Sequence, residues 1–338
     1  MLTHGHGRKA PSRVVVLGAN GFIARHVQEW CRAHDVACRP VGSTEIDLSD
    51  PANASRLAAI LHADDAIVMT SSLTPDKGRD YRVLMANMRM VETACLALEK
   101  ASCAHFVYLS SDAVYDANKI PLDEDSTREP VDVYALSHVG REILLSTELQ
   151  DGRIPLCILR LTNIYGPGDT HNTYGPNRFV RSALTEGRID LFGQGEERRS
   201  HVFIDDAVRL IGLCLERRSS GTLNVAVRHA VSFKEVAAIV VRLAGQPVRM
   251  QHLPRTVPVI HKPYKWTQVF RFLYNLGRPI GPVVHRTFVN SAVFAAFPEF
   301  RFTALEDGLK SFIDAYRTGL DQWRRLDSAP RHDGPERT

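Results

Sequence analysis

The chain has 338 residues, enough for two domains or for one large α/β domain with a cap, and for a sizeable buried core. Apolar residues make up 44% and charged residues 24% of the chain, which excludes a disordered protein, and a net charge of +4 is too small to indicate a nucleic-acid partner. No apolar run approaches the roughly 18 residues of a membrane-spanning helix, and the six cysteines form no CxxC pair, so we expect no metal site and no disulfide framework, as in a reducing cytoplasm.

Short β-branched runs alternate with helical segments in the first half of the chain. Strands are predicted at Arg13–Leu17, Val36–Val41, Ala66–Thr70, Ala104–Leu109 and Pro155–Leu161. Helices are predicted at Phe22–Ala33, Pro51–Leu61, Asp80–Lys100 and Val133–Leu149. This alternation is typical of βαβ crossovers, and it predicts a parallel sheet covered by helices on both faces.

The rhythm changes after Asn163, where glycine and proline become frequent. Strands are predicted at Ile189–Phe192 and His201–Ile204, a helix from Asp205, and a last helix at Leu305–Thr318. We expect a second, smaller domain in this half of the chain. Residues 1–12 and 324–338 are polar and are predicted to be flexible tails.

A glycine turn joins the first strand to the first helix. Gly18 allows a tight exit from the strand, and Gly21 lets a pyrophosphate approach the backbone at the helix N-terminus. Ala24 is small enough for close packing of the helix on the sheet. The turn therefore predicts a dinucleotide site, and its other expected contacts are Asn20, Phe22 and Ile23.

Two further motifs follow the predicted strand Ala104–Leu109. Ser110-Ser111-Asp112-Ala-Val-Tyr115 ends that strand, and Tyr134-Ala-Leu-Ser-His138 opens a helix. With the GxxGxxA turn, these motifs resemble the extended short-chain dehydrogenase/reductase family, the sugar-nucleotide epimerases and dehydratases, over about residues 13–320. Tyr115 and Lys119 share the spacing of a tyrosine–lysine pair, but Pro121 prevents a helix there, so we set that pair aside.

The resemblance implies a Rossmann-type doubly wound parallel sheet with a smaller C-terminal α+β substrate domain. The dinucleotide-binding domain would comprise residues 13–165 and 201–227, and the substrate-binding domain residues 166–200 and 228–323. The implied cofactor contacts are Asp47 and Leu48 at the adenine, the loop Thr70, Ser71 and Ser72 beneath the cofactor, and Asn87, which braces the strand before that loop.

The end of the second predicted strand bears on the choice of cofactor. An acidic residue there would accept the ribose hydroxyls of NAD, but the segment from Cys38 to Ser43 has no carboxylate. Arg39 and Ser43 suit a 2′-phosphate, so the sequence favours NADP over NAD. A plainly exposed Arg39 is the alternative.

The family resemblance makes Tyr134 the catalytic tyrosine and Ser111 its partner. Hydride transfer at a carbinol carbon requires a proton to leave or reach the oxygen, and a phenol can move it only if its pKa falls from about 10 toward neutrality. The family lowers that pKa with a lysine one helical turn later, where this chain has His138. A histidine with a pKa near 6.5 is mostly neutral at pH 7, so we expect His138 to replace the lysine only in part.

The same resemblance supplies the substrate contacts. Asp112, Asn163 and Asn177 fall at expected sugar or diphosphate positions, and Arg199 is the expected phosphate clamp because guanidinium binds a diphosphate bidentately. The dehydratases of the family place a glutamate after the aspartate, where this chain has Ala113, so a dehydratase is disfavoured. A solvated Arg199 beside Glu197 remains the alternative.

We therefore predict a cytoplasmic NAD(P)-dependent epimerase or 4-keto reductase that acts on a nucleotide sugar or a lipid-diphosphate sugar. The alternative is a catalytically weak NAD(P)-binding regulator or scaffold. The resemblance implies a homodimer through the helices Asp80–Lys100 and Val133–Leu149. The stretch between Glu235 and Glu299 has no acidic residue, and its aromatic and basic side chains either line a nucleotide-diphosphate cleft or form a peripheral membrane contact.

Overall fold

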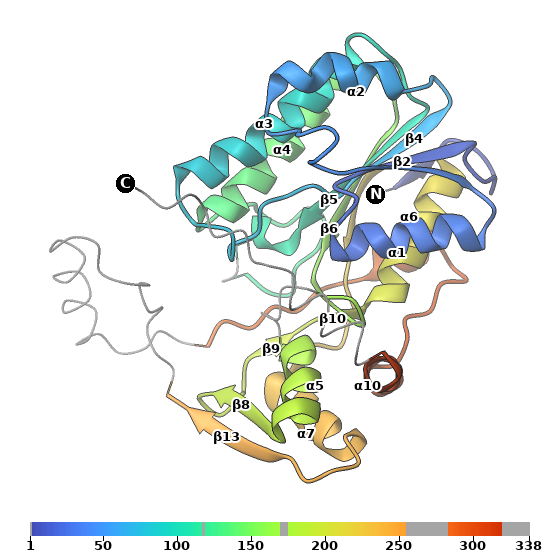
Figure 1. Cartoon of the computed structure of the whole chain (residues 1–338). Helices are drawn as coiled ribbons and strands as arrows, with labels where there is room; N and C mark the ends of the chain where they lie inside the picture. Colours follow the sequence, from blue (N-terminus) through green and yellow to red (C-terminus); the bar gives the residue numbers. More distant parts are fainter. Residues whose placement is uncertain (1, 117–118, 170–174, 255–282, 320–338) are drawn as a thin grey trace, which may run out of the picture.

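A computed structural model describes residues 2–116, 119–169, 175–254 and 283–319. Its centre is a seven-stranded sheet with the order β1-β11-β6-β5-β4-β2-β3 (Figure 1). Every pair in this sheet is parallel except β1 with β11. The parallel strands are β2 (Arg13–Leu17), β3 (Ala37–Val41), β4 (Asp65–Met69), β5 (His105–Ser111), β6 (Leu156–Leu161) and β11 (Ser219–Val225).

Helices cover both faces of this sheet (Figure 1). Alternate residues of β2 point to opposite faces: Val14 and Val16 join the hydrophobic cluster of α1 (Phe22–Ala33) and α6 (Ile204–Arg217), whereas Val15 and Leu17 join that of the other helices. These are α2 (Ala54–Ile60), α3 (Tyr81–Leu98) and α4 (Val133–Glu148). The strands are apolar on both faces because both are buried. The predicted Rossmann-type α/β fold is confirmed.

The predicted elements occur close to their expected limits, with one change of type. Pro51–Asn53 forms a 3₁₀ turn, η1, before α2, and the Asp50 side chain caps it. Aspartates also cap α3 and α4, where Asp80 accepts from the amides of Arg82 and Val83 and Asp132 accepts from that of Ala135. β5 continues beyond its predicted end, and the short 3₁₀ turn η2 (Asp112–Val114) follows it.

A second group of elements lies beyond the carboxyl ends of the parallel strands (Figure 1). β8 pairs in parallel with β13, α5 packs against α7, and α10 packs against both of these helices. Short pairs connect this group to the rest: β7 with β10, and β9 with β12. The bounds are β7 Asn163–Tyr165, α5 Gly175–Glu186, β8 Arg188–Phe192, β9 Arg198–Arg199, β10 His201–Phe203, β12 Val231–Ser232, α7 Phe233–Leu243, β13 Arg249–Leu253, α9 Ser291–Ala296 and α10 Leu305–Thr318.

The N-terminal segment differs from the predicted flexible tail. β1 (Thr3–His4) adds an antiparallel edge strand to β11, and His4 Nδ1 lies 2.9 Å from Ser219 Oγ. Arg8 forms an ion pair with Glu216, whose carbonyl accepts from the Lys9 amide at 2.8 Å. The segment is held because β11 offers unpaired edge amides and carbonyls that a composition-based argument does not reveal.

Two predictions lie largely or wholly outside the described residues. The aromatic and basic stretch falls mostly on residues 255–282, and the predicted C-terminal tail falls on residues 324–338. Within the ranges described, no helix combines the length and the apolar character needed to cross a bilayer.

Candidate active site

The glycine turn has the geometry that a close-lying ligand requires. Gly18 has a φ of 91°, and a Cβ there would lie 2.8 Å from the Cα and the amide nitrogen of Ser71. Gly21 precedes α1 in an extended conformation, and no side chain caps the helix, so its first amide groups remain free for an anion. Ala24 is fully buried against the sheet, as predicted.

The loop after β4 lies directly beneath this turn. The Thr70 hydroxyl donates to the carbonyls of Leu17 and Gly18, at 2.9 and 3.2 Å. The hydroxyls of Ser71 and Ser72 are buried and have no partner among the described residues. Asn87 is fully buried and holds the loop from below: its Oδ1 accepts from the Leu73 amide at 2.7 Å and its Nδ2 donates to the Leu73 carbonyl at 3.0 Å. Asn87 therefore positions the loop and does not line the pocket.

One cavity of about 180 Å³ brings the glycine turn and the catalytic candidates together. α4 contributes Tyr134 and His138, which lie one turn apart on its buried face. The end of β5 contributes Ser111, which is 9% exposed and accepts from the Ala113 amide at 3.1 Å. The predicted residues that line this cavity are Gly21, Phe22, Ile23, Thr70, Ser72, Ser111, Asp112, Tyr134 and His138.

Tyr134 is not activated in this arrangement. Burial raises the pKa of its hydroxyl to about 12, and a hydrogen bond with Ser111 opposes that rise. A phenol with such a pKa is protonated at neutral pH, and it can donate a proton more readily than it can accept one. Further positive charge near the oxygen is needed for it to act as a base.

His138 does not provide that charge. It is 2% exposed, and its Nδ1 lies 2.7 Å from the hydroxyl of Tyr108. Burial and the neighbouring charge of Arg141 hold the pKa of His138 well below its ordinary value, so the ring is neutral at pH 7. Its Nε2 has no partner among the described residues, and the ring packs edge-on against Tyr134 at a centroid distance of 4.6 Å. A neutral histidine here can exchange a hydrogen bond with a ligand in the cavity.

Comparison with known proteins decides the family. The sequence profile of the NAD dependent epimerase/dehydratase family matches residues 14–226, well over half of the chain. The chain belongs to this family. An ADP-L-glycero-D-manno-heptose-6-epimerase from Cupriavidus pinatubonensis is 30% identical over 186 residues, which cover 52% of this chain and 56% of that relative.

Solved structures of the epimerase/dehydratase type share the fold. MoeE5 in complex with UDP-glucose and NAD has a TM-score of 0.71 at 22% identity, covering 91% of this chain and 99% of its own. A GDP-L-fucose synthetase from Naegleria fowleri bound to NADP has a TM-score of 0.75 at 14% identity, covering 95% and 99%. These likenesses confirm the Rossmann-type architecture.

The end of β3, which this family fold places beside the adenosine half of the cofactor, is polar and exposed. Arg39 forms an ion pair with Glu45, with Nη1 at 3.1 Å from one carboxylate oxygen. Asp47 accepts from the amide and the hydroxyl of Ser49, at 2.9 and 2.8 Å, so its carboxylate stabilises a turn. Leu48 is buried, and its carbonyl accepts from Thr93. None of these residues, nor Asn20, lines the cavity of Tyr134.

The predicted substrate residues are more dispersed than the catalytic group. Asp112 lines the cavity and pairs with Arg286, whose Nη1 donates to the Asp112 carbonyl at 2.6 Å and lies 3.3 Å from its carboxylate. Asn163 lies between two lining residues, Thr162 and Ile164, and is itself half-buried outside the lining. Arg199 forms an ion pair with Glu197 and lies away from the cavity.

Asn177 is fully buried and does not face a pocket in this structure. Its Oδ1 accepts from the Gly166 amide at 3.1 Å, and its Nδ2 donates to the Ile164 carbonyl at 3.4 Å. The amide therefore shapes the loop after β7. Direct contact of Asn177 with a substrate remains a prediction, which would require this loop to rearrange.

Sequence reasoning missed the buried ionic groups behind the cavity. Glu142 accepts from Ser110 at 2.6 Å and from Arg160 at 3.0 and 2.8 Å, so the strand that bears Ser111 is tied to α4. Tyr115, which the sequence analysis set aside, is fully buried and donates to Asn224 Oδ1 at 2.7 Å. The Glu142 signal was available, because it lies eight residues after Tyr134 on the same face of α4. Arg286 gave no signal, because it lies 174 residues from its partner Asp112.

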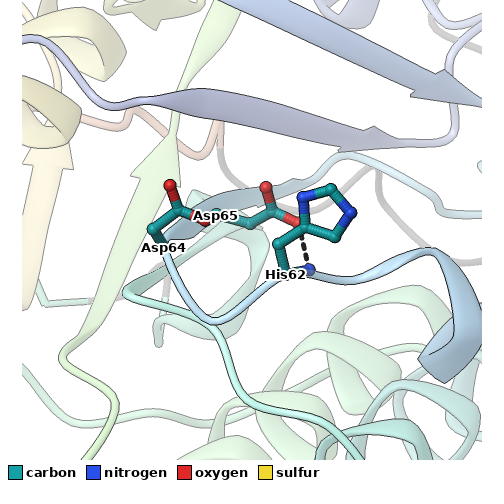
Figure 2. Close-up of side chains that lie close together, drawn as sticks. All are labelled: His62, Asp64 and Asp65. Atoms are coloured by element: carbon teal, nitrogen blue, oxygen red, sulfur yellow. Dashed lines mark hydrogen bonds between the residues drawn. The ribbon is translucent and has the colours of Figure 1, made fainter.

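A cluster of candidate metal ligands lies at the opposite end of β4 from the Thr70 loop. Figure 2 shows His62, Asp64 and Asp65 with their ligand atoms close together, and the structure places these atoms within 4.8 Å of one another. The Asp65 carboxylate is already held: both oxygens accept from Arg13 at 2.7 Å, and one also accepts from the His62 amide at 2.7 Å. The guanidinium thus occupies the place that a cation would take.

A larger cavity of about 1010 Å³ contains none of the predicted site residues. His201, Phe288, Asn290 and Phe302 are among the residues that line it. His201 is buried, and neither ring nitrogen has a partner among the described residues. The chemistry-bearing residues predicted from the sequence instead gather in the smaller cavity.

Proposed function

We propose that this member of the epimerase/dehydratase family transfers hydride between NAD(P) and a carbinol or keto carbon of a nucleotide sugar or a lipid-diphosphate sugar. The reaction that the site supports best is C4 epimerisation or 4-keto reduction. The observation that carries the proposal is that Ser111, Tyr134 and His138 line the same cavity as the helix N-terminus after the glycine turn.

The residues present fit a dinucleotide. The space at Gly18 that a Cβ would fill, the free amides at the start of α1 and the unpartnered hydroxyls of Ser71 and Ser72 together offer room and donors for a pyrophosphate. His138 Nε2 is a further unpartnered group on the wall beside Tyr134. When bound, the nicotinamide would accept or donate the hydride.

The residues of the chain would handle the proton. Tyr134 would donate a proton to the substrate oxygen during reduction and accept one during oxidation, and Ser111 would hydrogen-bond the same oxygen. His138 Nε2 would hold a cofactor hydroxyl. Because the pKa of Tyr134 is raised to about 12 in the unliganded chain, we expect reduction to be the easier direction at neutral pH.

The substitution Tyr134→Phe tests this function. It removes the proton donor but keeps the ring, so turnover should fall by about 10²–10⁴-fold while cofactor affinity stays within about twofold. A panel of nucleotide sugars screened for NADPH oxidation and for C4 inversion measures turnover, and cofactor titration measures affinity. Tyr81→Phe is the matched control, because Tyr81 is 66% exposed at the start of α3.

A second function has one observation in its favour. The neutral His138 and the high pKa of Tyr134 suit a dinucleotide-binding regulator or scaffold that does not turn over substrate. Such a protein would bind the cofactor with the affinity of an enzyme but show no turnover on the whole panel, and Tyr134→Phe would then change nothing.

Two further features of the proposal concern partners. We propose NADP(H) as the preferred cofactor, because the only charged side chain on β3 is Arg39. We propose a homodimer through α3 and α4, which expose apolar side chains: Tyr81 and Met85 on α3, and Leu136 and Ile143 on α4.

A further inference from the structure

Arg141 is a buried cation on the catalytic helix. It lies seven residues after Tyr134, two turns along α4 on the same face, and it is 0% exposed. Its Nη2 donates to the Ser71 carbonyl at 2.6 Å, so α4 is joined to the loop that underlies the glycine turn.

This guanidinium is not neutralised. Its Nε and Nη1 are buried and have no hydrogen-bond partner, and no carboxylate within the described residues forms an ion pair with it. The adjacent Glu142 is already engaged by Arg160 and Arg128. A buried charge without a counter-ion is costly, and it is found where its field has a use.

Aromatic groups of the site surround the charge. The Arg141 guanidinium carbon lies 5.0 Å from the centroid of the Tyr108 ring. The Tyr108 hydroxyl lies 2.7 Å from His138 Nδ1, and the His138 ring contacts the Tyr134 ring. Arg141, Tyr108, His138 and Tyr134 therefore form one continuous buried array that ends in the cavity.

We propose that Arg141 is a positioning residue whose buried guanidinium supplies the fixed positive charge of the active site, while the neutral His138 supplies only a hydrogen bond. The proposal rests on the function proposed above and deepens it. It divides between two side chains of α4 the charge and the hydrogen bond that the site requires.

The electrostatic consequences follow from the surrounding groups. The charge of Arg141 lowers the pKa of Tyr134 and also that of His138, so it favours the phenolate and keeps the imidazole neutral. The carboxylates of Asp112 on η2 and Asp132 at the start of α4 act in the opposite direction on Tyr134. From α3, Asn87 approaches this face of α4 and is neutral.

A purely structural role for Arg141 makes a different prediction. If the side chain served only to hold the Ser71 carbonyl, its loss would weaken folding or cofactor binding but would leave the titration of His138 unchanged. The titration of His138 therefore separates the two roles, and it requires no substrate.

The first experiment follows the ring resonances of His138 by NMR as the pH is varied, in the full chain with bound cofactor and with His138→Gln to assign the signal. In the wild type the pKa of His138 should lie below 6.5. Arg141→Met should raise it by about one unit or more, whereas Arg141→Lys should leave it near the wild-type value. A wild-type pKa of 6.5 or higher, or an Arg141→Met variant that titrates like the wild type, would overturn the proposal. Arg141→Gln, which retains a donor for the Ser71 carbonyl, replaces Arg141→Met if that variant does not fold.

The second experiment measures turnover against pH. Loss of the charge should lower the rate of substrate oxidation by about tenfold or more at each pH, with KM unchanged because Arg141 does not touch the cavity, and Arg141→Lys should restore most of that rate. An Arg141→Met variant that retains the wild-type rate contradicts the proposal. If no substrate is turned over but the His138 shift occurs, the proposed function fails while the charge assignment stands.

Discussion

At the scale of single residues, the site combines a catalytic group that the sequence contains with an environment that it does not show. Ser111, Tyr134 and His138 meet as the motif spacing predicts, because one lies at the end of β5 and the others lie one turn apart on α4. The protonation states depend on burial and on Arg141, and neither can be read from the motif. His138 is neutral for two reasons, burial and charge, where the sequence analysis had only its ordinary pKa.

The cofactor preference is also a residue-scale property. Arg39 is engaged by Glu45 in an exposed ion pair, and such pairs contribute only about 0–1 kcal/mol, so a phosphate can displace the carboxylate. Glu45→Gln should raise NADPH affinity several-fold because it frees Arg39 and removes a repelling charge, and Arg39→Ala should lower it about tenfold. Cofactor titrations with NADH and NADPH measure both effects.

Arg82→Ala is the control for these titrations, because Arg82 is an equally exposed arginine paired with Asp80. NADPH and NADH affinities that keep the same ratio in Arg39→Ala would contradict the assignment of NADP(H).

At the scale of elements, local patterns were reliable where burial is symmetrical. β2 was predicted at its observed limits, and so was α1, because a fully apolar strand, a glycine turn and an amphipathic helix follow one another directly. The helix predicted at Pro51 begins instead as a 3₁₀ turn, since proline and asparagine in its first residues favour a tight turn capped by Asp50. Asn177 and Arg199 lie on correctly predicted surroundings but engage protein partners.

The glycine turn gives a prediction at this scale. Gly18→Ala should destabilise the fold by about 3 kcal/mol or more, because it adds a Cβ at positive φ and forces it against backbone atoms of Ser71. Cofactor binding should be lost as well. Denaturant unfolding and cofactor titration provide the measurements.

Gly152→Ala is the matched control, since Gly152 also has a positive φ, 73°, but has no atom within 4 Å of the added Cβ. It should cost only about 1–2 kcal/mol of backbone strain. Equal losses in the two variants would show that the contact with Ser71 does not matter.

At the scale of the whole molecule, contacts between distant segments complete the site and the sheet. Arg286 reaches Asp112 beside the catalytic serine, and β1 closes the edge of β11. His105 on β5 is bonded to the Ser219 carbonyl at the start of β11 at 2.7 Å, and burial lowers its pKa to about 4.

This buried histidine predicts acid sensitivity. Its folded pKa is lowered below the unfolded value of 6.5, so its contribution is complete above pH 6.5 and is lost as the pH falls toward about 4. Between pH 7 and pH 5 the free energy of unfolding should fall by about 2 kcal/mol from this group. His105→Gln, which retains a hydrogen-bond donor but does not titrate, should remove that part of the decrease in denaturant unfolding experiments. An unchanged pH dependence would show that the imidazole is not held neutral in the folded chain.

The sequence by itself determined the alternation of strands and helices, the glycine turn and the pairing of Tyr134 with His138, because each of these depends on residues that are close along the chain. Only the tertiary structure decided which buried charges are neutralised: Glu142 is bound by arginines, Arg141 is not, and Arg286 crosses from the second group of elements to Asp112. The reason is physical, since electrostatic energies depend on distances through space and on exclusion from water, and these arise when remote segments pack together.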